Sequence, residues 1–465
     1  MTAAITTYGK IAPIDAMLAP LFALCAWVTL NPYFLWHSLR HMAIAGMISG
    51  CLAIVALLLG DRPRRGEAPG FILICLFVLY ISMLPKVDGS TTRWYFVLPT
   101  LFALAVFSDQ RRGKILQWFG WFFALSLIPG ILASLCKIVG LPVQMDHLPL
   151  LNPAMAEAGG FYLHAPGALL LSGNHVSLPW GGELYRLCAV YDEPGMVGTL
   201  SAFLLAGNRF RLKPFPFFII FIGGVLSFSL AFIVMASLGF LFRLVQARSP
   251  LPLLPLAILG LFGLLVLGIL KPKGPDLQPA LPVATQARVM EPNSSLQEGP
   301  VEPVGKPASS SAASTSTAVP IAPLAVQQPE PDQQLRQTQY INNRSLPEMD
   351  KLFARYLDAD TRTLLFGMGA DSSVVHGGVS QVVTRILTDF GLIGALLFAL
   401  AMISLSLAIT HSAKRRLWVL LFFALFALSI YQRPIVWMPY AFTMFICSST
   451  LAGRRKSTSE AQPAS

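Results

Sequence analysis

The chain has 465 residues, of which 54% are hydrophobic and only 12% are charged. A soluble domain usually carries about 25% charged residues, so this composition excludes a large soluble core and predicts a polytopic membrane protein. The net charge of +11 does not indicate nucleic-acid binding, because the basic residues lie in short clusters between apolar runs, the pattern that sets membrane orientation.

Twelve apolar runs are predicted to be membrane helices, since a span needs about 20 residues and shorter runs are tolerated. The block 214–246 is divided at Ser227-Phe228-Ser229, because two helices there keep the charge pattern consistent. The N-terminus lacks a cleavable signal pattern, so the first run is expected to stay in the chain. The runs are 16–31, 43–60, 69–84, 94–109, 115–139, 188–206, 214–228, 229–246, 251–270, 389–409, 417–431 and 434–451.

Basic residues follow every even-numbered run, and this alternation predicts the topology. By the positive-inside rule both termini lie in the cytoplasm, and the two long connections face outward. The chain then divides into helices 1–5 (1–140), a first periplasmic loop (141–187), helices 6–9 (188–270), a Pro/Ser/Ala-rich segment (271–339), a second periplasmic loop (340–388), and helices 10–12 with a cytoplasmic tail (389–465). The basic residues are Arg62, Arg64, Arg65, Arg111, Arg112, Lys114, Arg209, Arg211, Lys213, Arg248, Lys414, Arg415, Arg416, Arg454, Arg455 and Lys456.

The second long connection has two parts. Residues 271–339 have a composition that buries too little apolar surface to fold, so we predict a disordered tether. From residue 340 onward the pattern predicts an amphipathic helix, with Leu352, Phe353, Tyr356 and Leu357 on one side. A glycine-rich turn then leads into the tenth run.

No metal or cofactor is predicted. The six cysteines are scattered, mostly inside apolar runs, without CxxC spacing, which is typical of small buried hydrophobic residues. His147, His164 and His175 fit no metal-site spacing. The chain also lacks the sequence patterns of a P-loop, a zinc protease, an α/β-hydrolase and an EF-hand.

The first candidate site is RLCAVYDEPGMVG, residues 186–198. If this segment is helical, Arg186 and Glu193 share a face. They form either a buried ion pair, or a cation that holds a phosphate beside a carboxylate that orients or deprotonates a hydroxyl. Spacing alone leaves both open. Pro194 suits the first turn of a helix, and Glu193 then lies near its positive end.

The second candidate site precedes the tenth run. Arg344 and Arg355 are outward arginines, and a planar guanidinium suits a pyrophosphate, although a solvated helix face explains Arg355 equally well. Arg385 and Asp389 lie four residues apart, and we favour a simple i,i+4 ion pair. His376 is a base candidate near neutral pH, whereas a lone loop histidine is usually only solvated.

Three stretches together carry a resemblance. Residues 186–194, Arg-Leu-Cys-Ala-Val-Tyr-Asp-Glu-Pro, resemble the Arg, small, aromatic, Glu-Pro signature of the O-antigen polymerase and ligase superfamily. LSFSLAFIVMASLGFLF (226–242) resembles its serine-marked hairpin. FGMG (366–369) and RILTDFGLIG (385–394) are similar to its glycine turn and the following helix start.

The resemblance implies a helical, GT-C-like membrane glycosyltransferase at the periplasmic face of the bacterial inner membrane. Its donor is an undecaprenyl-diphosphate-linked oligosaccharide, with no nucleotide sugar and no required metal. Cations must then hold the diphosphate and another group must activate the acceptor hydroxyl. The catalytic candidates are Glu193, Arg186 and His376, and the substrate-binding candidates are Arg344, Arg355, Tyr191, Gly367, Gly369 and Arg385.

One departure favours a polymerase over a ligase. Ligases carry a His-Asn pair upstream of the Gly-Leu-Ile-Gly start, where this chain has Ser380-Gln381. The expected product is exopolysaccharide, capsule or O-antigen, with membrane lipid around the chain and a chain-length regulator or export protein as candidate partners. The alternatives are a ligase acting on lipid A-core and a transporter of lipid-linked sugars. The transporter is disfavoured, because the sequence shows no internal repeat and its charges cluster outward.

Overall fold

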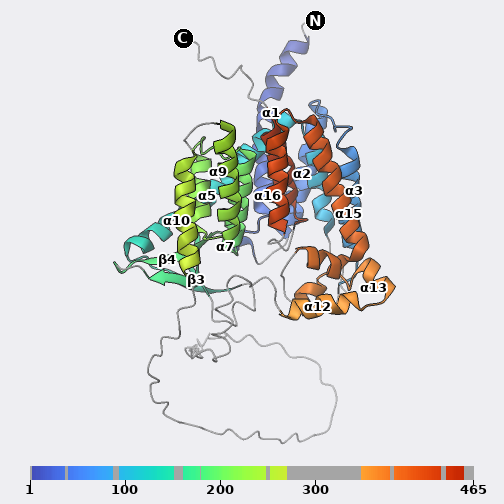
Figure 1. The fold of residues 1–465 in the computed structure, drawn as a ribbon. Coiled ribbons are helices and arrows are strands. Elements are labelled where there is room, and N and C mark those ends of the chain that lie inside the picture. The colour runs from blue at the N-terminus through green and yellow to red at the C-terminus, as the bar shows by residue number, and fades with distance from the viewer. Residues whose placement is uncertain are drawn as a thin grey trace, which may run out of the picture.

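The computed structural model describes residues 3–36, 40–86, 94–150, 161–177, 180–247, 252–269, 347–376, 382–430 and 436–454. Most of this chain forms helices that stand side by side in one bundle (Figure 1). A small sheet and several short helices cover one end of the bundle. The start of the first helix and the end of the last helix lie at the other end, which we call the terminal end. The end with the sheet is the sheet end.

Each of the twelve predicted apolar ranges contains a helix. Three of these helices, α2, α5 and α15, are long and apolar enough to cross a membrane, and eight others contain shorter apolar helical segments, α17 being the exception. The described chain is therefore consistent with a helical membrane protein, while the number of spans and their orientation stay predictions. The helices are α1 (Ala3–Val28), α2 (Arg40–Leu58), α3 (Ala68–Met83), α4 (Leu98–Val106), α5 (Asp109–Val139), α7 (Pro194–Gly207), α8 (Pro216–Leu226), α9 (Leu230–Ala247), α10 (Leu253–Ile269), α15 (Val382–Ser412), α16 (Arg416–Ile430) and α17 (Pro439–Gly453).

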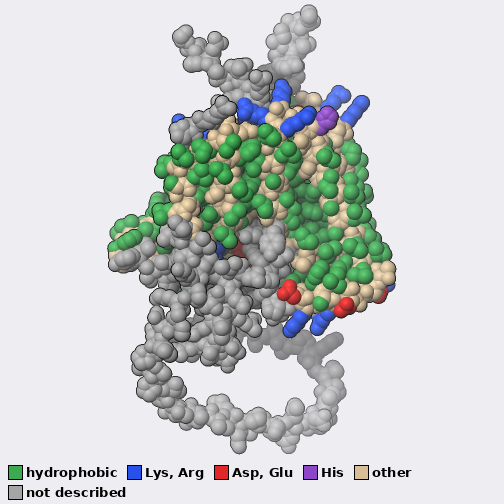
Figure 2. Space-filling view, in the orientation of Figure 1, with side chains coloured by type: hydrophobic (Ala, Val, Ile, Leu, Met, Phe, Trp, Pro, Cys, Tyr) green, Lys and Arg blue, Asp and Glu red, His purple; other side chains and the backbone are tan. Residues whose placement is uncertain are grey.

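The outer surface of the bundle is apolar. Figure 2 shows hydrophobic side chains over the middle of the molecule, with lysine and arginine gathered along the rim at the terminal end. Many large apolar side chains point outward, among them Leu58 at 82% and Ile403 at 55% exposure. A water-soluble protein rarely exposes contiguous apolar surface of this extent, so a lipid environment explains the exposed band.

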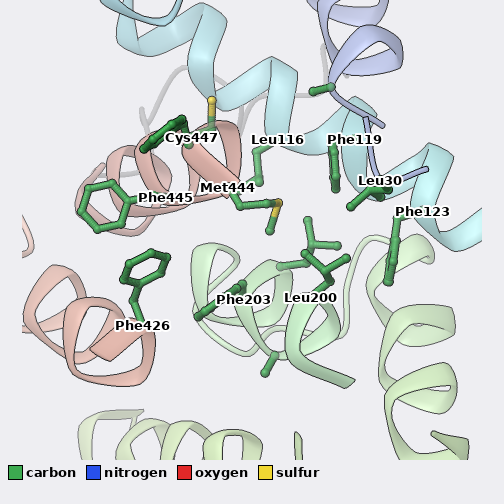
Figure 3. Packing of buried hydrophobic residues seen from close by; sticks show 14 of the residues in the cluster. Leu30, Leu116, Phe119, Phe123, Leu200, Phe203, Phe426, Met444, Phe445 and Cys447 are labelled. Carbon is green, nitrogen blue, oxygen red and sulfur yellow. The ribbon is translucent and has the colours of Figure 1, made fainter. Parts of the chain in front are cut away.

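The interior is filled by aromatic and aliphatic side chains from helices that are far apart in sequence. Figure 3 shows Phe119 and Phe123 of α5, Phe203 of α7 and Phe445 of α17 converging on one cluster. All four are less than a tenth exposed. This core fixes α7, the helix that follows the first candidate site, against α5 and α17.

The division of 214–246 into two helices is confirmed. Helix α8 ends at Leu226 and α9 begins at Leu230. Between them Phe228 has a left-handed φ of 48°, and the Ser227 hydroxyl donates to the Gly224 carbonyl at 2.6 Å. The hydroxyl thereby satisfies a carbonyl that the ended helix leaves without its usual partner.

The expectation of an all-helical fold is wrong in the first long connection. Strands β1 (Asp146–Pro149), β2 (Phe161–Ala165), β3 (Ala168–Ser177) and β4 (Glu183–Ala189) form an antiparallel sheet in the order β1-β2-β3-β4. The boundary predicted at residue 188 is also wrong, because β4 runs to Ala189 and α7 begins at Pro194. The predicted run 188–206 therefore begins within a half-buried strand, whose apolar residues resemble the start of a membrane helix.

The remaining short elements also lie in connections. They are the 3-10 helices η1 (Tyr33–Leu35) and η2 (Trp94–Val97), and the helices α12 (Pro347–Leu357), α13 (Thr361–Phe366) and α14 (Ser372–His376). The amphipathic helix is confirmed in α12, where Leu352 and Tyr356 are buried. Leu357, predicted on the same side, is instead 57% exposed. The tether predicted for 271–339 lies outside the described residues.

Buried charges are paired where α5 begins. Arg112 is fully buried and forms an ion pair at 2.7 Å with Glu67, and it donates two hydrogen bonds to the Leu104 carbonyl. Arg111 forms ion pairs with Asp15 and Asp61, both at 2.7 Å. Burying a charge is tolerated only with such partners, so these carboxylates fix α1, α2 and α3 to α5.

We predict that Glu67→Ala destabilises the protein by about 3–5 kcal/mol, because it leaves the buried Arg112 guanidinium with only the more distant Asp109, at 4.0 Å, as a carboxylate partner. The matched variant is Asp15→Ala. The Asp15 side chain is 45% exposed, and its partner Arg111 keeps the ion pair with Asp61 in this variant. That variant is expected to lose less than about 1 kcal/mol. Thermal unfolding in detergent measures both, and equal losses would contradict the role assigned to burial.

Candidate functional site

Strand β4 has two faces, and Arg186 lies on the face opposite to α5. Leu187 and Ala189 belong to the main core, whereas Cys188 packs in a separate cluster with Tyr162 of β2. Because residues two apart share a face of a strand, Arg186 lies on the side of Cys188. Its side chain is partly exposed, and its Nε donates to the Ser227 carbonyl at 3.4 Å.

The bundle side of β4 rests on α5 at Gly130. A Cβ at Gly130 would lie 2.6 Å from Leu187 Cδ1 and 3.1 Å from Ala189 Cα, so only glycine allows this approach. The neighbouring Pro129 lies inside α5 and packs beneath Gly167 of the β2–β3 turn. The sheet is therefore seated on one short segment of α5.

Tyr191 fixes the turn between β4 and α7. Its side chain is fully buried and stacks on Phe123 with ring centroids 5.5 Å apart. Its hydroxyl accepts a hydrogen bond from Trp27 Nε1 at 3.0 Å and pairs with the Ser126 hydroxyl at 2.7 Å. Tyr191 thereby joins the first motif to α1 and α5, while the substrate contact proposed from sequence stays a prediction.

Glu193 precedes the helix that the sequence predicted. It is the residue before α7, with extended backbone (φ −134°, ψ 137°), and Pro194 opens the helix as expected. Its carbonyl accepts the first hydrogen bond of the helix, from Met196 N at 3.0 Å. Arg186 and Glu193 do not share a helical face, since one lies on a strand and the other at a helix start.

The charged groups of the first motif nevertheless converge. Burial first, and then the carboxylates of Asp192 and Glu193, raise the pKa of the Cys188 thiol, while Arg186 opposes this shift. Burial, followed by repulsion from Cys188 and the same two carboxylates, raises the pKa of Tyr162. The Tyr162 hydroxyl also donates to the Asp192 carbonyl, so the turn that carries Asp192 and Glu193 lies against the Cys188–Tyr162 contact. Arg186 is on the Cys188 face of β4, and it therefore lies on the same side of the sheet.

The serine-marked junction of α8 and α9 lies beside this group. A Cβ at Gly198 of α7 would lie 2.4 Å from Ser229 Cβ and 2.9 Å from Ser227 Oγ. This contact brings the first turns of α7 against the junction whose carbonyl receives Arg186. Two stretches of the resemblance, 186–194 and 226–242, are thus adjacent in the fold.

The third stretch of the resemblance is built on two glycines. Gly367 has φ +84°, and Gly391 interrupts α15 with φ +68° and ψ −173°. A Cβ on Gly367 would lie 2.5 Å from the Asp389 carbonyl oxygen, and one on Gly391 would lie 2.4 Å from Gly367 N. Tyr80 of α3 donates to the Phe390 carbonyl at the break, at 2.8 Å. The glycine turn therefore sits against the interrupted helix, backbone to backbone.

Arg385 and Asp389 form the predicted i,i+4 ion pair, at 3.1 Å. Arg385 also meets Asp371 at 3.2 Å, and the fully buried Asp389 accepts hydrogen bonds from Ser372 and Ser373. With 3% of its side chain exposed, Arg385 lies over the Trp437 ring at 5.3 Å. These contacts hold the second motif together, while substrate binding by Arg385 stays a prediction.

The other predicted residues are not brought into one cluster. Arg355 lies exposed on α12, and Gly369 is in the turn with φ +108°. His376 ends α14, but its side chain lies outside what the structure describes. Arg344 and the Ser380-Gln381 pair lie outside the described residues.

Among the residues that the structure describes, no group of three or more His, Cys, Asp or Glu side chains is placed to hold a metal. Comparison of the chain with protein-family models, curated proteins and solved structures gave no match. The functional assignment therefore rests on the residues and their geometry.

Sequence reasoning missed the polar partners of the second motif. Lys86, at the end of α3, forms an ion pair with Asp371 at 3.2 Å, and the Ala370 N–H donates to the Pro85 carbonyl. Nothing in the sequence pairs residues this far apart. The consecutive polar run Asp371-Ser372-Ser373 before an apolar helix was the one visible signal, because polar groups there need buried acceptors.

We predict that Gly391→Ala disrupts the second motif. An alanine at φ +68° and ψ −173° is strained by about 1–3 kcal/mol, and its Cβ also overlaps the Gly367 backbone. Gly66→Ala is the control, because no atom lies within 4 Å of a Cβ at Gly66. Melting temperatures in detergent should separate them. A normal melting temperature for Gly391→Ala would show that the helix break is not needed.

Tyr191→Phe distinguishes packing from substrate contact. Removing the hydroxyl leaves Trp27 Nε1 without its acceptor, and an unsatisfied buried donor costs about 1–3 kcal/mol. We expect a lower melting temperature in detergent, with the polymerisation that the resemblance implies retained below that temperature. Loss of synthesis at an unchanged melting temperature would instead assign Tyr191 to the substrate.

Proposed function

We propose that the chain is a membrane glycosyltransferase of the bacterial inner membrane that polymerises lipid-linked repeat units at its periplasmic face. The supporting observation is the convergence of Arg186 with Asp192 and Glu193 at the start of α7, beside the Ser227–Ser229 junction. The stretch 186–194, the Ser227–Ser229 start of the second stretch and the glycine turn at 366–369 lie at the sheet end of the bundle (Figure 1).

The chemistry requires a cation and a base within one site. The acceptor hydroxyl oxygen attacks the anomeric carbon of the donor sugar, and the bond from that carbon to the diphosphate breaks. The diphosphate leaves with the bonding electrons, and Arg186 is proposed to hold it through charge-assisted hydrogen bonds. Glu193 is proposed to orient the acceptor hydroxyl or to take its proton.

The two long connections supply the elements that surround this site. Strands β1 to β4 stand between α5 and α7 in the sequence and carry Arg186 on the face that is not packed on α5. Helices α12 to α14 lie at the same end of the bundle (Figure 1). A polymer that grows outside the membrane needs such extramembrane elements, and we propose that the sheet and these helices border its path.

Arg186→Lys is predicted to keep membrane insertion and to lose roughly 10- to 100-fold in polymerisation, because lysine keeps the charge but not the planar fork. That range corresponds to one charge-assisted hydrogen bond of about 1.5–3 kcal/mol. The measurement is glycan length in a deletion strain that carries the variant. Single repeat units should accumulate on the lipid carrier.

The matched control is Arg362→Lys, which changes an exposed arginine of α13 and should leave polymer length unchanged. Normal polymer in the deletion strain itself would reject the function. Transfer of glycan to lipid A-core by the purified protein would identify a ligase instead.

A further inference from the structure

The terminal end of the bundle has two electrostatically different halves. In the half formed by α1, α2, α3 and the start of α5, three arginines meet carboxylates. Arg64 pairs with Glu67 and Asp109, and Arg111 and Arg112 are paired as described above. These carboxylates offset part of the positive charge there.

In the other half, five arginines come together. We call them the arginine cluster: Arg209, Arg211, Arg243, Arg415 and Arg454. They come from the α7–α8 connection, α9, the α15–α16 connection and the residue after α17. Among the residues that the structure describes, none of the five forms an ion pair with a carboxylate.

The packing of the helix ends fixes this arrangement. Arg209 is 8% exposed and donates to the carbonyls of Ala452 and Leu451 at 3.0 and 3.1 Å, and to that of Arg454. These carbonyls end α17, and a cation at a helix C-terminus is favourable. The Arg415 N–H donates to the Gly453 carbonyl at 3.1 Å, which brings the α15–α16 connection to the same place.

The like charges act on one another. Burial, and then repulsion from Arg415, Arg211 and Arg454, lowers the pKa of Arg209 to about 10. Arg243 donates to the Phe210 carbonyl, next to Arg209 and Arg211 in the chain. Holding cations together in this way is unfavourable, and an anion placed among them would relieve the repulsion.

The surface beside the arginine cluster is apolar. Phe215, Val245 and Leu417 are 61%, 71% and 58% exposed, and each is within four residues of a cluster arginine. A soluble anion gains nothing from these side chains, whereas a lipid places acyl chains against them and its phosphate at the rim. Clusters of basic residues at helix ends commonly receive lipid headgroups.

We propose that the arginine cluster binds the phosphate headgroup of an anionic phospholipid, whose acyl chains lie along α8, α9 and α16. Arg211 and Arg415 are the direct ligands, because Arg209 is committed to the end of α17. This site is at the opposite end of the bundle from the proposed glycan site and does not depend on it.

The test measures lipid binding to the purified full-length protein in detergent, as the rise in melting temperature on titration with phosphatidylglycerol or with zwitterionic phosphatidylcholine. The wild type should bind phosphatidylglycerol about tenfold more tightly. Each basic residue near the surface contributes a factor of about five, so Arg211→Gln with Arg415→Gln should weaken binding about 25-fold. The variant with lysine at both positions should keep the preference.

The matched control is Arg62→Gln with Arg65→Gln, which removes two exposed charges from the acid-paired half of the same end. Its affinity for phosphatidylglycerol should stay within about twofold of the wild type. Equal losses in the two glutamine variants, or no lipid preference in the wild type, would overturn the proposal. Equal stabilisation by inorganic pyrophosphate would overturn it in favour of a soluble anion.

Discussion

The contact between Gly130 of α5 and strand β4 determines where the first motif can lie. The strand approaches α5 so closely that a Cβ at Gly130 would lie 2.6 Å from the Leu187 side chain. Once β4 rests there, its alternation turns Arg186 to the other face. Tyr191 then reaches Ser126, about one turn of α5 away from Gly130, and α7 starts at Pro194. The partly exposed site is thus positioned entirely by buried, uncharged contacts.

The sequence predicted the parts of the fold that follow from local physical chemistry. Apolar runs predicted helices in all twelve ranges, and the serines at 227 and 229 marked a real break. Pro194 marked the start of α7. The sheet was missed because its first three strands lie within the connection 141–187, which was predicted as a loop. The end of β4 cannot be told from the start of a membrane run by hydropathy alone. Only pairing with β3 makes it a strand.

The sequence predicted the local contacts of the candidate site, but not the contacts between distant segments. The i,i+4 ion pair of Arg385 and Asp389 is a local relation, and it is confirmed. The contacts of Asp371 with Lys86 and of Tyr80 with Phe390 join segments separated by hundreds of residues, and no periodicity encodes them. The resemblance proposes Tyr191 as a substrate contact, but its burial depends on α1 and α5, and the sequence does not show these contacts.

Arg385 and Arg186 differ in how exposed their guanidinium groups are. Arg385 meets two carboxylates and an aromatic ring with 3% of its side chain exposed, so binding an anion there would require those contacts to open. Arg186 is partly exposed, and its Nε donates to the Ser227 carbonyl. Arg186 is therefore the more accessible of the two arginines, whereas the contacts of Arg385 hold the glycine turn against α15.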